Sequence, residues 1–191
     1  MGRKKRKNEE RVNEMSMPPV NPLQQSETAK NYFDRLVEDV RPAFESQGIE
    51  LNFAGYHQLR ELNKSLTPYE GEKAWYIAQG FLEWEDYFVG CLGVTEKLLL
   101  DSETSKQEIL AEASFRLDPK TVNNGNRLAN GDSKVVESRR IRNAYQSFHN
   151  QLKSKIKACQ TGHFMAKKTW EIAVMREQTH HYQQRNGGPR G

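Results

Sequence analysis

Residues 133–168, SKVVESRRIRNAYQSFHNQLKSKIKACQTGHFMAKK, contain the pattern that decides the fold class. Their apolar side chains recur at intervals of 4, 3, 4, 4 and 3 residues, at Ile141, Tyr145, Phe148, Leu152, Ile156 and Cys159. Such intervals place side chains on one face of an α-helix. The pattern predicts one long amphipathic helix over residues 133–179, which Gly162 would break or weaken.

Residues 26–118 carry further helix signals and are predicted to form a helical core domain. A helix should begin at Ser26, carry Phe33, Leu36, Val37 and Val40 on its inner face, and end or kink at Pro42. Residues 49–53 read as an extended linker, and a helix follows to Lys64.

Two capping boxes occur in this domain, Thr67-Pro68-Tyr69-Glu70 and Ser105-Lys106-Gln107-Glu108. Helices are therefore expected to open near Pro68 and Ser105. The first of these helices is apolar on most sides, Trp75 and Leu82 included, so it should be the central core element. Gly90 and Gly93 should bend or end it.

The rest of the chain reads as loop and tail. Asp118-Pro119 should stop the second of these helices, and residues 119–132 are predicted to be an Asn/Gly-rich loop. Residues 1–25, with several prolines, and residues 180–191 are predicted to be disordered. The expected architecture is all-α, with a helical core, a long C-terminal α-helical hairpin, and disordered basic N- and C-terminal tails.

Composition predicts an intracellular, water-soluble protein. No apolar run of 18 residues occurs, and the basic start lacks the apolar stretch of a secretory signal. The two cysteines, Cys91 and Cys159, belong to no spacing pattern, as expected in a reducing compartment. We expect a location in the cytoplasm of a host cell, in a nucleus or in a virion, with no membrane contact.

The net charge of +4 conceals a strong asymmetry along the chain. Residues 8–100 hold eight Lys/Arg and sixteen Asp/Glu, whereas residues 101–191 hold sixteen and nine. Five further cations form the N-terminal block Arg3, Lys4, Lys5, Arg6 and Lys7. An acidic centre between basic ends favours an anionic partner.

The predicted long helix concentrates this positive charge, because residues 133–168 hold nine Lys/Arg and one acid. At 100° per residue, Arg139, Arg142, Lys153 and Lys157 fall on one outer side of it. These four cations and the N-terminal block are the candidate nucleic-acid-binding residues, through contacts to backbone phosphates. For the helix, an acidic protein surface or plain solvation remains an alternative. For the block, the alternatives are a nuclear localisation signal, a membrane-surface contact or a solubilising tail.

Other motifs are weaker. The pair of helices around Ser65-Leu66-Thr67 has helix-turn-helix lengths, but Glu70 and Glu72 make the start of its second helix acidic, which favours an ordinary αα-hairpin. Cys159, His163 and His149 lack the spacing of a metal site. The acidic cluster Glu83, Glu85 and Asp86 does not share one helical face. No nucleophile or nucleotide-binding motif occurs, so we expect no enzymatic activity, no metal and no cofactor.

The layout resembles that of phage terminase small subunits. The resemblance rests on the hairpin from Ser105 to Gln178 through the Asn-rich turn, and on the basic arm Arg3 to Lys7. It implies a ring that binds viral DNA and regulates a large, ATP-hydrolysing subunit.

Two functions therefore compete. The first is an oligomeric nucleic-acid-binding assembly protein, with DNA favoured over RNA, a homo-oligomeric state, and a larger ATPase or structural subunit as a further partner. Its oligomeric state is expected because the apolar stripe along residues 141–174 should seek a partner helix. The alternative is a structural or adaptor component of a virion, connector or ribosome-associated complex, whose basic surface meets protein or RNA.

Overall fold

The computed structural model describes the backbone of residues 22–186 and the side chains of residues 32–182. The described residues form five helices and no strand. The helices are α1 (Pro22–Glu45), α2 (Ala54–Lys64), α3 (Gly71–Leu117), α4 (Val122–Ala129) and α5 (Ser133–Asn186). The predicted all-α class is confirmed, and so is the long C-terminal helix. Residues 1–21 and 187–191 lie outside the described part of the chain.

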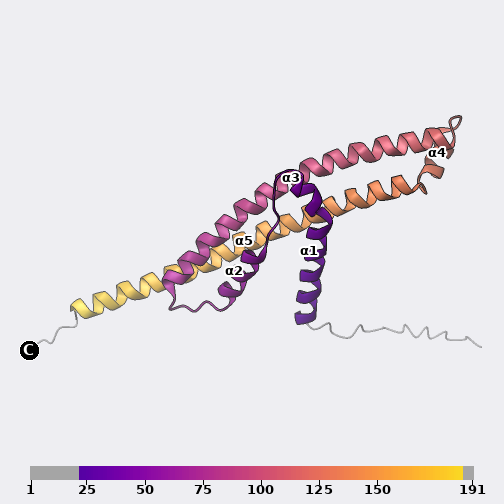
Figure 1. Ribbon diagram of the computed structural model, residues 1–191. Helices are drawn as coiled ribbons and strands as arrows, with labels where there is room; N and C mark the ends of the chain where they lie inside the picture. The colour runs from indigo at the N-terminus through magenta and orange to yellow at the C-terminus, as the bar shows by residue number, and fades with distance from the viewer. Residues whose placement is uncertain (1–21, 187–191) are drawn as a thin grey trace, which may run out of the picture.

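Helices α3 and α5 run antiparallel as a long hairpin closed by α4, with α1 crossing it near the middle and α2 packed on the half nearer to Gly71 (Figure 1). Polar contacts between the two long helices mark their register. Arg142 faces Glu103, His149 faces Glu96, Gln160 faces Glu85, and His163 faces the carbonyl of Ala78. We call the end near α4 the tip and the end near Gly71 the base.

The main core lies where α1 and α2 join the hairpin. Phe148 of α5 stacks on Phe33 at a ring-centroid distance of 6.1 Å and meets the edge of Phe44 at 5.7 Å. The predicted inner face of α1 is confirmed, because Phe33, Leu36, Val37 and Val40 are buried there. The α5 stripe from Tyr145 to Cys159 packs into the same core. Self-association, predicted from that stripe, would have to use other surfaces.

Helix α1 begins at Pro22, inside the segment predicted to be a disordered arm, and passes through Pro42 to Glu45. Pro42 lies in the last turn: it removes the hydrogen bond that an amide there would donate to the carbonyl of Glu38, and the helix ends three residues later. Gly48, at φ 75°, then reverses the chain, and the amide of Ile49 donates to the carbonyl of Phe44. Residues 49–53 form the expected linker.

Helix α3 begins at Gly71, three residues after the predicted opening. Glu70 instead closes a turn: its carboxylate accepts hydrogen bonds from the backbone amide and hydroxyl of Thr67, at 2.9 and 2.8 Å. The same carboxylate pairs with Lys73 at 2.8 Å. The Lys73 ammonium and the two Thr67 donors lower the pKa of Glu70 from 4.5 to about 2.

This carboxylate makes stability depend on pH. A lowered pKa means that the stabilisation is complete above about pH 4.5 and is lost as the pH falls towards 2. We expect Glu70→Gln to lower Tm at pH 6 and to match the parent protein near pH 2, in thermal melts followed by circular dichroism. Glu83→Gln, at an exposed position of α3, is the control. An equal Tm difference at both pH values would contradict the prediction.

A helix end at Gly90 or Gly93 and the predicted start at Ser105 are both wrong, since α3 is continuous to Leu117. Gly90 and Gly93 are exposed positions of the helix with no neighbour close to them. Each costs roughly 1 kcal/mol relative to Ala. Packing along α5 outweighs that cost. Trp75 and Leu82, predicted to be core residues, are 39% and 38% exposed.

The Asn/Gly-rich segment predicted to be a loop contains α4. The Asp118 carboxylate accepts hydrogen bonds from the amides of Lys120 and Thr121 and from the side chain of Asn124, which organises the approach to this helix. Gly125 then lets α4 approach α3, because a Cβ there would lie 2.6 Å from Ser114 Oγ. The glycine in this segment is therefore needed for close packing of two helices and does not mark a loop.

Helix α5 also runs further than predicted. It passes through Gly162 and ends at Asn186, so residues 180–186 are helical and not part of a disordered tail. Gly162 marks a close contact: a Cβ there would lie 2.5 Å from Cζ of Phe81. The glycine lets α5 pack directly on a buried ring of α3.

Candidate nucleic-acid interface

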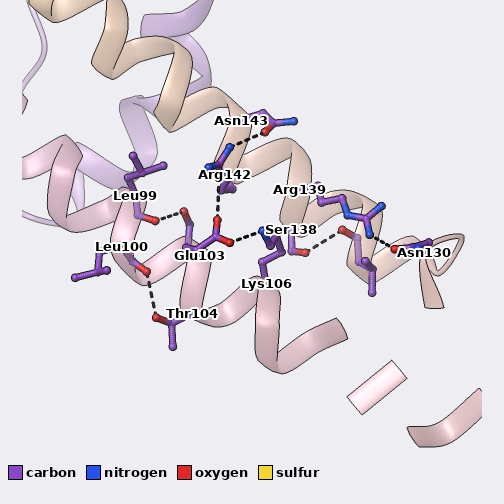
Figure 2. Close-up of polar contacts among 12 residues, drawn as sticks. Leu99, Leu100, Glu103, Thr104, Lys106, Asn130, Ser138, Arg139, Arg142 and Asn143 are labelled. Atoms are coloured by element: carbon purple, nitrogen blue, oxygen red, sulfur yellow. Dashed lines mark hydrogen bonds and ion pairs between the residues drawn. The ribbon is translucent and has the colours of Figure 1, made fainter. Parts of the chain in front are cut away.

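The structure divides the four cations predicted on α5 into two pairs with different surroundings. Arg142 Nε donates to Glu103 Oε2 at 2.9 Å, and Glu103 also pairs with Lys106 (Figure 2). The guanidinium of Arg139 donates to the side-chain oxygen of Asn130. Arg139 and Arg142 thus link α5 to its neighbours near the tip, and the charge of Arg142 is shared with a carboxylate.

Lys153 and Lys157 behave differently. They lie one turn apart on α5, both are exposed, and the ammonium group of neither forms a hydrogen bond or ion pair within the described part of the chain. An external anion can therefore reach these two ammonium groups without displacing a protein partner from them. Of the four predicted helix cations, these two are available to a phosphate.

Lys157 belongs to a larger feature, a groove of about 790 Å³ between α2 and α5. Arg60 and Lys64 contribute from α2, and Lys157 and Lys168 from α5. No carboxylate lines it. We call it the α2/α5 basic groove. Beside the groove, the carboxylate of Glu61 pairs with Lys64 at 2.7 Å.

The remaining lining is small, polar or aliphatic. Thr161 and Met165 continue the line of Lys157 along α5, and Asn63 lies one turn from Arg60 on α2. The aromatic member of the lining, Phe81, is buried beneath Gly162. The groove therefore offers cations and hydrogen-bond donors without an exposed ring on which a base could stack.

Lys155 lies beside the groove but does not contribute in the same way. Its ammonium sits 4.5 Å from the ring centroid of Phe33 and 5.6 Å from that of Tyr56. Burial, and then the nearby charge of Arg60, lower the pKa of Lys155. This cation is held by aromatic rings of the core and helps fix α1 and α2 against α5.

Sequence reasoning missed Arg60, Lys64 and Lys168. A partial signal exists, because Arg60 and Lys64 are one turn apart, and Lys157 and Lys168 are 11 residues, or about three turns, apart. Taken alone, each pair is what any solvent-exposed face of a helix could carry. Only the packing of α2 beside α5 brings the two pairs together. The predicted cations Arg3, Lys4, Lys5, Arg6 and Lys7 lie outside the described residues.

The other candidate groups are engaged within the fold. His149 contacts Glu96 at 3.2 Å, and His163 contacts the Ala78 carbonyl at 3.0 Å. Burial raises the pKa of the Cys159 thiol to about 11. Glu85 accepts a hydrogen bond from Gln160. Within the described ranges, no three His, Cys, Asp or Glu side chains are grouped to hold a metal ion.

Comparison with known proteins adds no relative: no family model, no curated protein and no solved structure matches this chain. Among the described helices, none combines the length and the apolar character needed to cross a membrane.

Proposed function

We propose that this chain is a non-enzymatic, oligomeric nucleic-acid-binding assembly protein that holds a DNA phosphate backbone in the α2/α5 basic groove. The observation that carries the proposal is a groove with four cations from two helices and no lining carboxylate. Concentrated positive charge, of which only Lys64 is paired within the described residues, with Glu61, repels itself in the free protein, and a polyanion relieves this repulsion.

The dimensions of the groove suit a nucleic-acid strand. Lys157 and Lys168 are 11 residues apart, which is roughly 16 Å along α5. Phosphates of duplex DNA follow one another at about 3.4 Å of helix axis per strand, so this distance covers about five of them. The absence of an exposed ring among the lining residues favours contact with the backbone over stacking of unpaired bases.

The N-terminal cations would extend this contact, because a charged arm can neutralise phosphates without a fixed geometry. A role like that of a terminase small subunit in viral DNA packaging agrees with the layout noted in the sequence. Such a protein would hand bound DNA to a larger ATPase subunit.

Neutralising the groove tests the proposal. In fluorescence-anisotropy titrations with a duplex, Lys157→Gln/Lys168→Gln should weaken binding about tenfold and reduce the slope of log K against log salt by about 1.8. Lys97→Gln/Lys134→Gln removes two cations exposed elsewhere and should change affinity less than about twofold.

Three outcomes would overturn it. These are no binding by the parent protein at roughly 50 mM salt, binding that salt does not weaken, and equal losses in the groove and control variants. Stronger binding to single-stranded RNA than to the duplex would instead favour the role of an RNA-associated structural component.

A further inference from the structure

Helix α5 extends past the first residue of α3 at the base of the hairpin. Gly71, the first residue of α3, lies against Ala173, where a Cβ on the glycine would be 2.8 Å from the alanine Cβ. The 13 residues 174–186 continue beyond this point, roughly 20 Å of helix (Figure 1). We call this segment the overhang. An isolated helix of this length is marginal in water, so a packing partner would stabilise it.

The overhang carries two large apolar side chains in the open. Met175 and Tyr182 are 65% and 71% exposed and lie seven residues apart, which places them on one side of α5. The turn before α3 touches another side, where the Arg176 guanidinium lies 5.0 Å from the Tyr69 ring centroid. Met175 and Tyr182 therefore form a short apolar seam that this chain leaves uncovered.

Helix α3 carries a second uncovered seam with the same spacing. Trp75 and Leu82 are also seven residues apart and are both more than a third exposed. They face away from α2, because α2 contacts α3 at Gly80 and Trp84, and Leu82 lies about 200° around the helix from each of them. Trp75 also contacts Trp170 of α5, at a centroid distance of 4.9 Å.

We propose that a second copy of this chain covers both seams, with the overhang of each copy packed on the α3 seam of the other. A two-fold axis near the level of Gly71 and Ala173 would place each overhang along the first 13 or so residues of the partner's α3. Met175 would then lie near Trp75 and Tyr182 near Leu82 of the other copy, since both pairs span roughly 10 Å. The contact is isologous and closes at two copies.

This inference rests on the oligomeric part of the proposed function and gives it an interface, yet it does not depend on nucleic-acid binding. None of the four seam residues lines the α2/α5 basic groove. Loss of DNA binding in the groove variants would leave the dimer intact, and loss of the dimer can be measured without DNA.

Native mass measurement of the full chain, at about ten micromolar and without nucleic acid, is the first test. The parent protein should be a dimer, and Met175→Glu/Tyr182→Glu should halve its mass to that of one copy. These two side chains project from the overhang, so the variant should keep the helicity of the hairpin. Phe115→Glu, which alters an exposed apolar residue at the tip, should remain a dimer.

Cross-linking tests the geometry. Within one copy, Leu82 lies near the level of His163, some 19 residues or roughly 28 Å along α5 from Tyr182. A mixture of Leu82→Cys and Tyr182→Cys proteins should therefore give a disulfide-linked dimer on mild oxidation, and neither protein alone should. The native Cys91 and Cys159 are buried. A monomeric parent protein, a mass above two copies, a dimer that survives the double glutamate change, or no cross-link in the mixture would overturn the proposal.

Discussion

Phe148→Ala is expected to lower the free energy of unfolding by about 3–5 kcal/mol, the largest effect of any change considered for this protein. The side chain is fully buried, and its ring contacts Phe33 and Phe44 of α1. Removing it takes away the buried ring area and leaves a cavity between α1 and α5. Urea unfolding followed by circular dichroism would measure the difference.

The matched control is Phe164→Ala on the same helix. Phe164 is 65% exposed, so its loss should change stability by less than about 0.5 kcal/mol. The contrast separates burial from the intrinsic preference of α5 for alanine, which both changes share. Similar losses at the two positions would show that Phe148 is not the centre of the core.

Gly162→Ala is the second large effect, with an expected loss of about 1–3 kcal/mol. Alanine is the better helix former, so propensity alone predicts a gain of nearly 1 kcal/mol. The new methyl group, however, would lie 2.5 Å from Cζ of Phe81 and 2.6 and 2.8 Å from its two Cε atoms. The buried ring has little room to move, so overpacking outweighs propensity.

Gly93→Ala provides the control of opposite sign. Gly93 is an exposed helical position with no atom near the added methyl group, so alanine should stabilise the protein by about 1 kcal/mol. Both variants can be compared in guanidinium denaturation at constant m-value. Stabilisation by Gly162→Ala would contradict the close contact between α3 and α5.

The periodic part of the fold could be predicted from the sequence because periodicity is a local property. The stripe through Phe148 and Leu152 and the inner face of α1 around Val37 both correspond to buried faces in the structure. Helix boundaries were harder to predict. Ser105 has the sequence of a helix start, yet it lies inside α3, since packing on α5 extends the helix past a local signal.

The α2/α5 basic groove was not predictable for a related reason. The sequence indicates that Lys157 is on the outer side of a basic helix, and the structure agrees that this lysine is exposed. Lys157 is 97 residues from Arg60 along the chain, and no local rule states that their helices become neighbours. Arg142 was instead predicted to bind nucleic acid, whereas the structure pairs it with Glu103. This salt bridge depends on the register of α3 against α5, which no local rule states either.

The register of the hairpin also bears on the order in which the chain folds. Facing residues are 39 apart at Glu103 and Arg142, near the tip, and 85 apart at Ala78 and His163, near the base. Closing the longer loop costs only about 0.7 kcal/mol more in chain entropy. Burial of Phe148 alone is worth several times this amount. We expect the rate-limiting encounter to occur at the aromatic core around Phe148, midway along the hairpin, with the tip closing afterwards and reopening first.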